Sequence, residues 1–266
     1  MVIDSRTAPE AENVERQATD EERYTALNGE IEAYCRSLGL DLYGVASAAA
    51  YEERFPEKPK PSSFVSDAQS IIVIGIAFEP STVATVLHPH LSNLRPYTPE
   101  QIANPRSIEQ PPEARRFFLF DERTMIIQEM NWMAYRIAKK LRREGWRTFH
   151  VPVIAQDGRR RVAPFQHMPA MYLAGLGTLG LNCCILTPEY GPRAFFTTII
   201  TNIPLPTGQP MEKDMCTHCN LCVENCPVGA IDGEGWKHIQ LCTCCRTCLA
   251  ICPVGKDAKE VRSYPG

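Results

Sequence analysis

The spacing of apolar positions along the chain predicts helices that alternate with strands up to about residue 205. Between residues 22 and 38, apolar side chains recur at steps of three and four before Gly39, which predicts an amphipathic helix with a glycine stop. The same spacing over residues 125–141 ends in RREG and predicts a second helix. A third predicted helix begins near Gln166.

Runs of β-branched and aromatic residues predict the strands between these helices. The run SIIVIGIAF at 70–78 is apolar almost throughout, which is typical of a strand buried on both faces. Helices alternating with strands indicate an α/β or α+β domain. The predicted strands cover residues 40–47, 70–78, 147–153, 183–187 and 194–201.

The chain changes character beyond Pro210, where closely spaced cysteines replace the alternating elements. We expect a flexible N-terminal arm over residues 1–20, which are polar and without periodicity, then an α/β domain over 21–208 and a small cysteine-rich domain over 209–266. The proline-rich segment 79–116 is expected to form a long loop over a site or a surface excursion.

Composition excludes several classes of protein. A chain of 266 residues with 44% hydrophobic residues can bury one large core or two modest ones, so disorder is excluded as its main state. The net charge of -3 and the absence of a long basic run disfavour a nucleic-acid partner. The longest apolar run has eight residues, against the ~20 that span a bilayer, so we expect no membrane helix. The N-terminus shows no export signal, and we expect a cytoplasmic protein.

The cysteines carry the strongest chemical signal. Nine of the 12 lie between residues 216 and 252, and eight of these spell C-x2-C-x2-C-x3-C-P twice. In a reducing compartment such clustering indicates a cofactor rather than disulfide bonds. Three thiolates on one tight loop can reach three irons of a [4Fe–4S] cube, and the fourth reaches across to the other cluster. Structural zinc sites pair two distant C-x2-C motifs. They require neither a third cysteine in each loop nor the Cys-Pro pair that ends both motifs here.

This spacing predicts two interleaved sets of ligands for two [4Fe–4S] clusters. Cys244 lies beside the second loop and could replace Cys242 as a ligand. Cys35, Cys183 and Cys184 are interpreted as buried small hydrophobic residues, the last two on opposite sides of a strand. The first predicted set is Cys216, Cys219, Cys222 and Cys252, and the second is Cys226, Cys242, Cys245 and Cys248.

The segment before the cysteines, AGLGTLGLNCCILTPEYGPRAFFTTIITNIPL at 174–205, closely resembles a core segment of the reductive dehalogenases and the related epoxyqueuosine reductases. Weaker resemblance extends over most of residues 25–256. It implies a nitroreductase-like, corrinoid-binding α/β core followed by a ferredoxin-like module with two [4Fe–4S] clusters, an α+β fold overall. The resemblance also implies cobalamin, held by residues along the corrinoid: Gly175, Gly177, Gly180, Asn182, Thr187, Pro188, Glu189, Tyr190, Gly191 and Pro192.

The residues that donate protons in these families are less clear in this chain. Epoxyqueuosine reductases place an Asp just ahead of a Pro before AGLG, and that Asp position falls at Arg161. The substitution, and the lack of a helical-repeat domain after the clusters, disfavour tRNA epoxide reduction. The chemistry of the approach to AGLG instead makes Arg161, His167 and Tyr172 the candidate catalytic residues, as anion stabiliser or proton donors.

We therefore expect an oxidoreductase of the reductive dehalogenase type. A low-potential donor, ferredoxin or flavodoxin, would pass electrons through the two clusters to a corrinoid that cleaves a carbon–halogen or carbon–oxygen bond of a small organic substrate. One alternative is a two-cluster electron-transfer protein without catalysis of its own, and a minor alternative is a tRNA-modifying enzyme similar to the epoxyqueuosine reductases.

Overall fold

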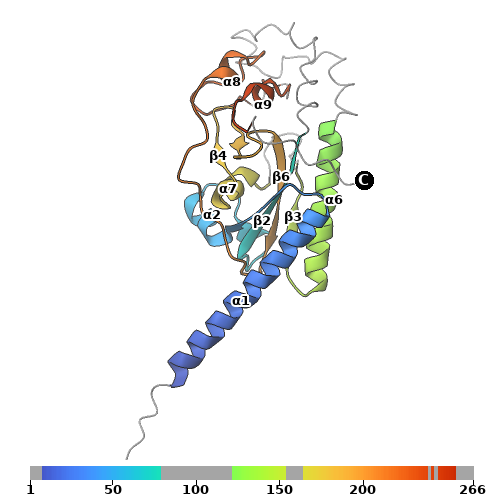
Figure 1. Ribbon diagram of the computed structural model, residues 1–266, viewed down its shortest axis with the longest axis vertical. Coiled ribbons are helices and arrows are strands. Elements are labelled where there is room, and N and C mark those ends of the chain that lie inside the picture. Colours follow the sequence, from blue (N-terminus) through green and yellow to red (C-terminus); the bar gives the residue numbers. More distant parts are fainter. Residues whose placement is uncertain (1–7, 79–121, 154–163, 239–240, 243–244, 256–266) are drawn as a thin grey trace, which may run out of the picture.

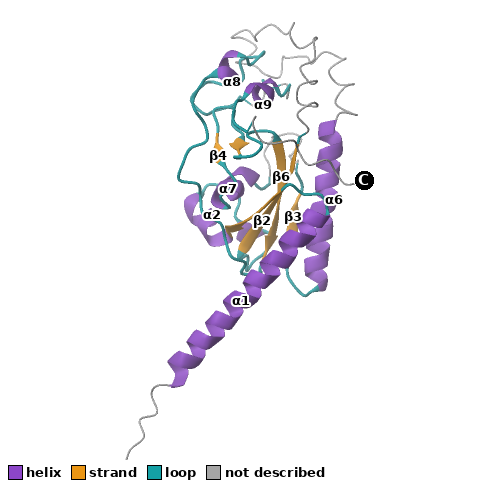
Figure 2. Ribbon diagram, in the orientation of Figure 1, coloured by secondary structure: helices purple, strands orange, loops and turns teal. Residues whose placement is uncertain are grey.

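The computed structural model describes residues 8–78, 122–153, 164–238, 241–242 and 245–255 (Figure 1). Strands form the centre of the molecule, and the cysteine-rich part is mostly loop with two short helices (Figure 2). The elements are α1 (Ala8–Ser37), β1 (Leu42–Ser47), α2 (Ala48–Arg54), the 3-10 turn η1 (Pro61–Ser63), β2 (Ser70–Ala77), α6 (Glu122–Arg143), β3 (Thr148–Val151), α7 (His167–Leu173), β4 (Thr178–Leu179), β5 (Ile185–Leu186), β6 (Ala194–Thr201), α8 (Leu221–Glu224) and α9 (Thr247–Ile251).

Four strands form one sheet in the order β1-β2-β6-β3, and every neighbouring pair is antiparallel. The antiparallel pairing makes the fold α+β rather than α/β. The strands predicted at 40–47, 70–78, 147–153 and 194–201 are confirmed as β1, β2, β3 and β6, with small differences at their ends. The run at 183–187 contributes only the two residues of β5, which pair with β4 in a separate ribbon.

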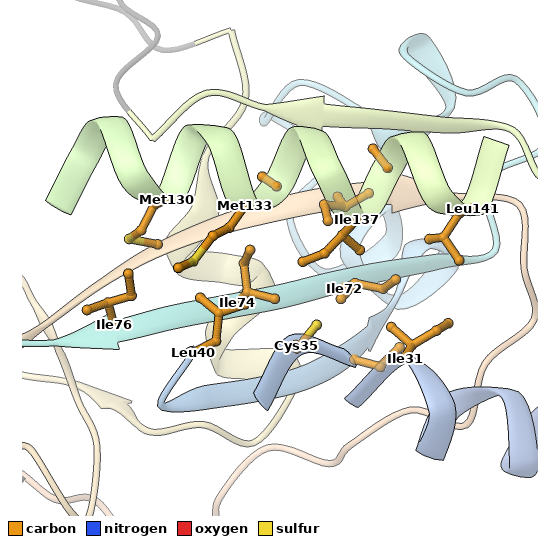
Figure 3. Packing of buried hydrophobic residues seen from close by; sticks show 14 of the residues in the cluster. Ile31, Cys35, Leu40, Ile72, Ile74, Ile76, Met130, Met133, Ile137 and Leu141 are labelled. Atoms are coloured by element: carbon orange, nitrogen blue, oxygen red, sulfur yellow. The ribbon is translucent and has the colours of Figure 1, made fainter. Parts of the chain in front are cut away.

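Strand β2 is buried along its whole length, as its sequence predicts. Because successive side chains of a strand point to opposite faces, Ile72, Ile74 and Ile76 enter one core and Ile71 and Val73 the other. The first core lies between the sheet and helices α1 and α6 (Figure 3). The apolar stripe of α6 that the sequence predicts faces this core.

The opposite face of the sheet is covered by α2 and α7. Tyr51 of α2 and Phe165 are fully buried there, with their rings stacked at 5.0 Å. The hydroxyl of Tyr51 donates to the carbonyl of Gln166, just before α7. The sheet is therefore the middle of three layers, and the cysteine-rich part with α8 and α9 lies beyond its end (Figure 1).

The flexible arm expected over residues 1–20 is wrong for its larger part, since α1 begins at Ala8 and continues unbroken to Ser37. Apolar periodicity detects only helices with one apolar face, and this stretch has none in its sequence. Its sequence, APEAENVERQATDEER, is rich in Ala, Glu, Gln and Arg, which favour a helix by their intrinsic propensity.

The segment expected to form a loop, 79–116, lies outside the described residues. No helix in the described part of the chain is both long enough and apolar enough to cross a bilayer.

Candidate functional site

The two cysteine loops fold alike. Asn220 and Arg246 follow the second cysteine of each motif, and both have left-handed backbones, with φ of 59° and 64°. Each residue precedes a short helix, α8 or α9, that carries the third cysteine. In both loops its carbonyl accepts the N–H groups three and four residues further on. The two loops, which have the same cysteine spacing, therefore have the same local backbone structure.

The eight cysteines gather around two cavities in the same two sets that the spacing predicts. The smaller cavity is lined by Cys216, Cys219, Cys222 and Cys252. The larger is lined by Cys226, Cys242, Cys245 and Cys248. In each set one cysteine comes from the other motif, so the interleaving is a property of the fold. Cys244 lies outside the described residues, and the assignment of ligands stays a prediction.

The surroundings of these thiols suit an iron cofactor. Burial raises the pKa of Cys222, Cys248 and Cys252, so these thiols keep their protons until a cation binds. The N–H of Ala230 donates to Sγ of Cys226 at 3.2 Å. Such donors stabilise thiolate ligands in iron–sulfur sites.

The larger cavity has a volume of about 340 Å³ and lies between the core domain and the second cysteine set. Its walls are mainly apolar and include Phe78, Met171 and Phe195. The ring of Phe78 packs against Phe195 at 4.6 Å, and the guanidinium of Arg246 lies over Phe78 at 5.3 Å. An apolar chamber that touches four thiols is suited to a large cofactor or a substrate beside a cluster.

Lys237 brings a second cation to the larger cavity. The backbone of Lys237 is held by a bridge to Ile231, at the end of a turn in which Asp232 accepts two backbone N–H groups. Burial lowers the pKa of Lys237, but the negative charges of the neighbouring cysteines as thiolates, with Cys184 and Cys248 the largest contributors, together raise it more, and the net pKa lies above its ordinary value. Sequence reasoning missed both Lys237 and Arg246, because cations beside a cysteine motif have no characteristic spacing.

Cys183 and Cys184 differ from their interpretation as strand residues. They lie in the turn before β5, and both line the larger cavity. Cys183 has a left-handed backbone with φ of 55°, and its thiol donates to the carbonyl of Gly235 at 3.1 Å. Cys35, by contrast, is fully buried in the core, where burial raises its pKa to about 12.

Arg193, the last residue of the TPEYGPR loop, joins the core domain to the cysteine-rich part. Its guanidinium donates to the carbonyl oxygens of Leu249, Cys252 and Val254 at 2.5 to 3.1 Å. Leu249 belongs to α9 and Cys252 follows it, so Arg193 places a positive charge at the end of that helix. Arg193 is 8% exposed. This residue fixes the backbone of a predicted ligand.

Close backbone packing within the protein, rather than contact with a corrinoid, explains why glycine occurs in AGLGTLG and in the following loop. A Cβ at Gly175 would lie 2.3 Å from the carbonyl oxygen of Gln209, and one at Gly177 would lie 2.2 Å from that of Leu186. At Gly191 it would lie 2.0 Å from the carbonyl oxygen of Val254. These glycines let protein backbone approach protein backbone, which explains them without a macrocycle.

The remaining residues expected along a corrinoid are divided between the two cavities and the loop. Pro192 lines the larger cavity, while Gly180 and Asn182 line the smaller one. The amide of Asn182 donates to the carbonyl of Cys248 at 3.4 Å. In the loop, Thr187 is buried and its hydroxyl accepts the backbone N–H of Tyr190, while Pro188 and Glu189 are exposed.

The two candidate catalytic residues that the structure describes, His167 and Tyr172, are not brought together, and Arg161 lies outside the described residues. Tyr172 faces α2, where its hydroxyl accepts a hydrogen bond from Arg54 at 3.1 Å. His167 lines the larger cavity, yet Nδ1 contacts the hydroxyl of Thr198 at 3.1 Å and Nε2 the carbonyl of Pro152 at 3.3 Å. A carbonyl can only accept, so Nε2 carries the proton and His167 is a neutral, fixed ring.

Burial lowers the pKa of His167 to about 4, and this predicts a measurable pH dependence of stability. The unfolded chain binds the proton near pH 6.5, so the contribution of His167 is complete above that pH and is lost as the pH falls toward 4. Between pH 7.5 and pH 5 the loss is about 2 kcal/mol. Urea unfolding under anaerobic conditions should show His167→Gln to be less acid-sensitive than the parent. Equal acid sensitivity would refute the neutral buried ring.

Comparison with known proteins identifies the class. Residues 211–232 match the family model of the 4Fe-4S binding domain. The chain is 25% identical over 232 residues to an epoxyqueuosine reductase of Bacillus anthracis, which covers 78% of this chain and 53% of that protein. A shorter stretch of 67 residues is 43% identical to the epoxyqueuosine reductase of Bacillus subtilis strain 168, covering 25% of this chain and 17% of the relative. The chain spans about half the length of the curated relatives that match most of it.

Solved structures share the fold. An epoxyqueuosine reductase in complex with an epoxyqueuosine-modified tRNA-Tyr stem loop superposes with a TM-score of 0.59 at 19% identity, covering 88% of this chain and 67% of that one. A catabolic reductive dehalogenase superposes with a TM-score of 0.56 at 18% identity, covering 86% of this chain and 32% of that one.

The family model and the cysteine motif define an iron–sulfur protein, and the relatives that match most of the chain carry the name of a reductase, in agreement with the predicted oxidoreductase. The resemblance to the superfamily of epoxyqueuosine reductases and reductive dehalogenases is confirmed. Within it, the curated relatives carry the name epoxyqueuosine reductase, which favours the minor alternative of the sequence analysis over the dehalogenase type.

The expectation against a nucleic-acid partner is wrong. The matching relatives are epoxyqueuosine reductases, and one of the structural neighbours holds a tRNA stem loop. The net charge of -3 is a sum over the whole chain, and it conceals local concentrations of basic residues. The last two turns of α6 form one such concentration.

Proposed function

We propose that this chain is a corrinoid-dependent iron–sulfur reductase of the epoxyqueuosine reductase type, acting on an oxygenated group carried by RNA. The observation that carries the proposal is the larger cavity, where apolar walls of the core domain meet the second cysteine set. A cavity in this place lets a reducible cofactor lie against a cluster and against a substrate. The similarity to epoxyqueuosine reductases over 78% of the chain favours reduction of a carbon–oxygen bond over a carbon–halogen bond.

The donor sets fit two [4Fe–4S] clusters. Thiolates are the ligands that such clusters require, and each cavity brings together four cysteines. Cys216, Cys219, Cys222 and Cys252 would hold the outer cluster, and Cys226, Cys242, Cys245 and Cys248 the inner one. Cys219 is exposed, so a low-potential donor such as a ferredoxin or flavodoxin would meet the outer cluster first.

The apolar walls beside the inner cysteine set would form one side of a corrinoid site. Phe78, Phe195 and Met168 offer apolar surface against which a large flat ring can pack, next to the inner cysteine set. A structural neighbour at 19% identity and a TM-score of 0.52 is a dehalogenase described as B12-dependent. A corrinoid bound there would supply a cobalt centre that can be reduced to a strong nucleophile.

The residues that line the larger cavity would exclude water, supply positive charge and keep the wall rigid around the substrate. The apolar walls exclude water, which strengthens electrostatic interactions inside the cavity. Lys237 and Arg246 place two positive charges where an electron arrives, and positive charge favours the reduced state of a nearby centre. His167, neutral and held at both nitrogens, keeps its part of the wall rigid and is not positioned as an acid.

The test uses protein reconstituted anaerobically with iron, sulfide and hydroxocobalamin. We expect about one corrinoid per chain, a base-off Co(II) signal in electron paramagnetic resonance, and conversion of an epoxyqueuosine-containing RNA stem loop. Two electrons and two protons remove the epoxide oxygen as water, so the product is lighter by one oxygen atom in mass spectrometry. A halogenated phenol serves as the competing substrate.

Cys219→Ala provides the matched control. It interrupts the outer cluster but not the cavity, so the variant should keep its corrinoid and lose donor-driven turnover. Iron–sulfur signals without corrinoid retention would overturn the proposal and leave an electron-transfer protein. Turnover of the phenol and not of the RNA would assign the dehalogenase reaction instead.

A further inference from the structure

A series of aromatic rings runs from the outer side of α6 to the edge strand β3 and around its edge. Trp132 contacts Tyr135 with ring centroids 6.1 Å apart, and Tyr135 contacts the imidazole of His150 at 5.6 Å. Phe149, the preceding residue of β3, points to the other side of the sheet, where it lies 5.0 Å from Phe64, with its ring centroid 6.2 Å from that of His150. These rings come from three separate elements, so the series exists only in the folded protein.

Two rings of this series are exposed to solvent and do not belong to either hydrophobic core. Trp132 is 67% exposed and Phe149 is 38% exposed. Strand β3 is at the edge of the four-stranded sheet, where no further strand covers it among the described residues. Phe64, at the inner end, anchors the series through an edge contact with the buried ring of Phe165.

The same face is strongly basic. Lys139 and Arg142 lie over the ring of Tyr135 at 5.8 and 5.9 Å, and Arg136 and Arg143 are exposed on the same half of α6. Basic residues in the last turn of a helix complement its dipole. Arg136 and Lys139 lie before that turn, and the dipole does not explain why cations alternate with exposed rings.

Ring faces interleaved with cations match single-stranded nucleic acid. Bases stack on aromatic side chains, while Arg and Lys pair with the backbone phosphates. An acidic peptide would use the cations and leave Trp132 without a role. A second copy of this chain would bring the same positive charges and repel.

We propose that the face formed by Trp132, Tyr135, Arg142 and Arg143 beside strand β3, here called the α6–β3 face, binds an unpaired stretch of RNA. The inference rests on the proposed function, in that the RNA carries the group that is reduced. It goes beyond that function because it assigns RNA contact to a surface outside the larger cavity, and none of the four residues lines that cavity. Helix α6 has 22 residues and is about 33 Å long, so it can follow several nucleotides.

The test measures fluorescence anisotropy of a labelled RNA stem loop with the reconstituted protein. Trp132→Ala should weaken binding about tenfold through the loss of one stacked base. The pair Arg142→Gln and Arg143→Gln should weaken binding and reduce the slope of log K against log salt by about one to two. The control pair Arg23→Gln and Lys58→Gln removes two charges from α1 and from the loop after α2, and should bind as the parent does.

The outcomes separate this proposal from the function it rests on. Corrinoid retention and the Co(II) signal report on the cavity and should be unchanged in Trp132→Ala. If the stem loop binds all the variants as tightly as the parent, the α6–β3 face is refuted and the reductase is untouched. If an acidic peptide binds this face and RNA does not, or if the variants only change a dimer equilibrium, the RNA assignment is overturned. If the corrinoid is never retained, the proposed function fails whatever the RNA does.

Discussion

Replacing Arg193 with methionine should destabilise the protein by about 3 kcal/mol, because one buried and two partly buried carbonyl groups lose a charged donor at once. The loss should reach beyond stability. Arg193 holds the carbonyl of Cys252, a predicted outer-cluster ligand that arrives from the second motif. We therefore expect the variant to lose iron from the outer cluster before the inner one. Thermal unfolding and iron analysis of protein prepared without oxygen measure the two effects.

Two comparison variants isolate the cause. Arg193→Lys keeps the positive charge but lacks the planar guanidinium that reaches three carbonyl groups at once. Its stability should therefore lie between those of the parent and of Arg193→Met. Arg54→Met removes an exposed arginine that also contacts an aromatic ring and one hydroxyl, and should cost less than about 1 kcal/mol. Equal stability of Arg193→Met and the parent would contradict the role of Arg193 as a link between the two parts.

Cys252→Ala should remove the cluster of the first motif although Cys252 belongs to the second. The cavity lined by Cys216, Cys219 and Cys222 includes Cys252 and none of the other cysteines of its own motif. We expect the iron content to fall from about eight to about four per chain. The paramagnetic signal that remains should belong to the inner cluster.

Cys226→Ala is the reciprocal variant and should remove the inner cluster while the outer one remains. The two variants should thus show complementary spectra, each with about half of the iron. If Cys252→Ala instead resembled Cys245→Ala, each motif would hold its own cluster and the interleaved assignment would be wrong. Retention of all the iron in either variant would refute the ligand itself.

The sequence predicted those elements whose pattern is set by burial. Strand β2 is apolar on both faces because two cores flank the sheet, and the stripe on α6 is apolar because one face packs on it. The start of α1 was missed because residues 8–20 show no apolar period in the sequence. The pattern alone left the fold class open between α/β and α+β, since strand direction depends on pairing that no local pattern contains, and the α+β class came from the resemblance.

In the candidate site, too, some features could be predicted from the sequence and others depend on tertiary contacts. Cysteine spacing predicted which thiols would meet, because the loops are short and each ligand set is nearly determined by local geometry. The reason for Gly175, Gly177 and Gly191 was not predictable, since the backbone they approach comes from distant segments. Lys237, Arg246 and the α6–β3 face likewise depend on tertiary contacts. A whole-chain net charge of -3 gave no sign of that basic surface.

One of the differences between the matched loops gives the two proposed cluster sites a polarity. The left-handed position holds Asn220 in the first loop, and Asn tolerates that backbone well. In the second loop it holds Arg246, which is 6% exposed and lies over Phe78. Cys219, beside Asn220, is the one exposed thiol among the eight described cluster cysteines. In the proposed function an incoming reductant would therefore meet the outer cluster at Cys219, while the positive charge of Arg246 would favour the reduced state of the inner cluster. Electrons would then pass from the outer cluster to the inner one.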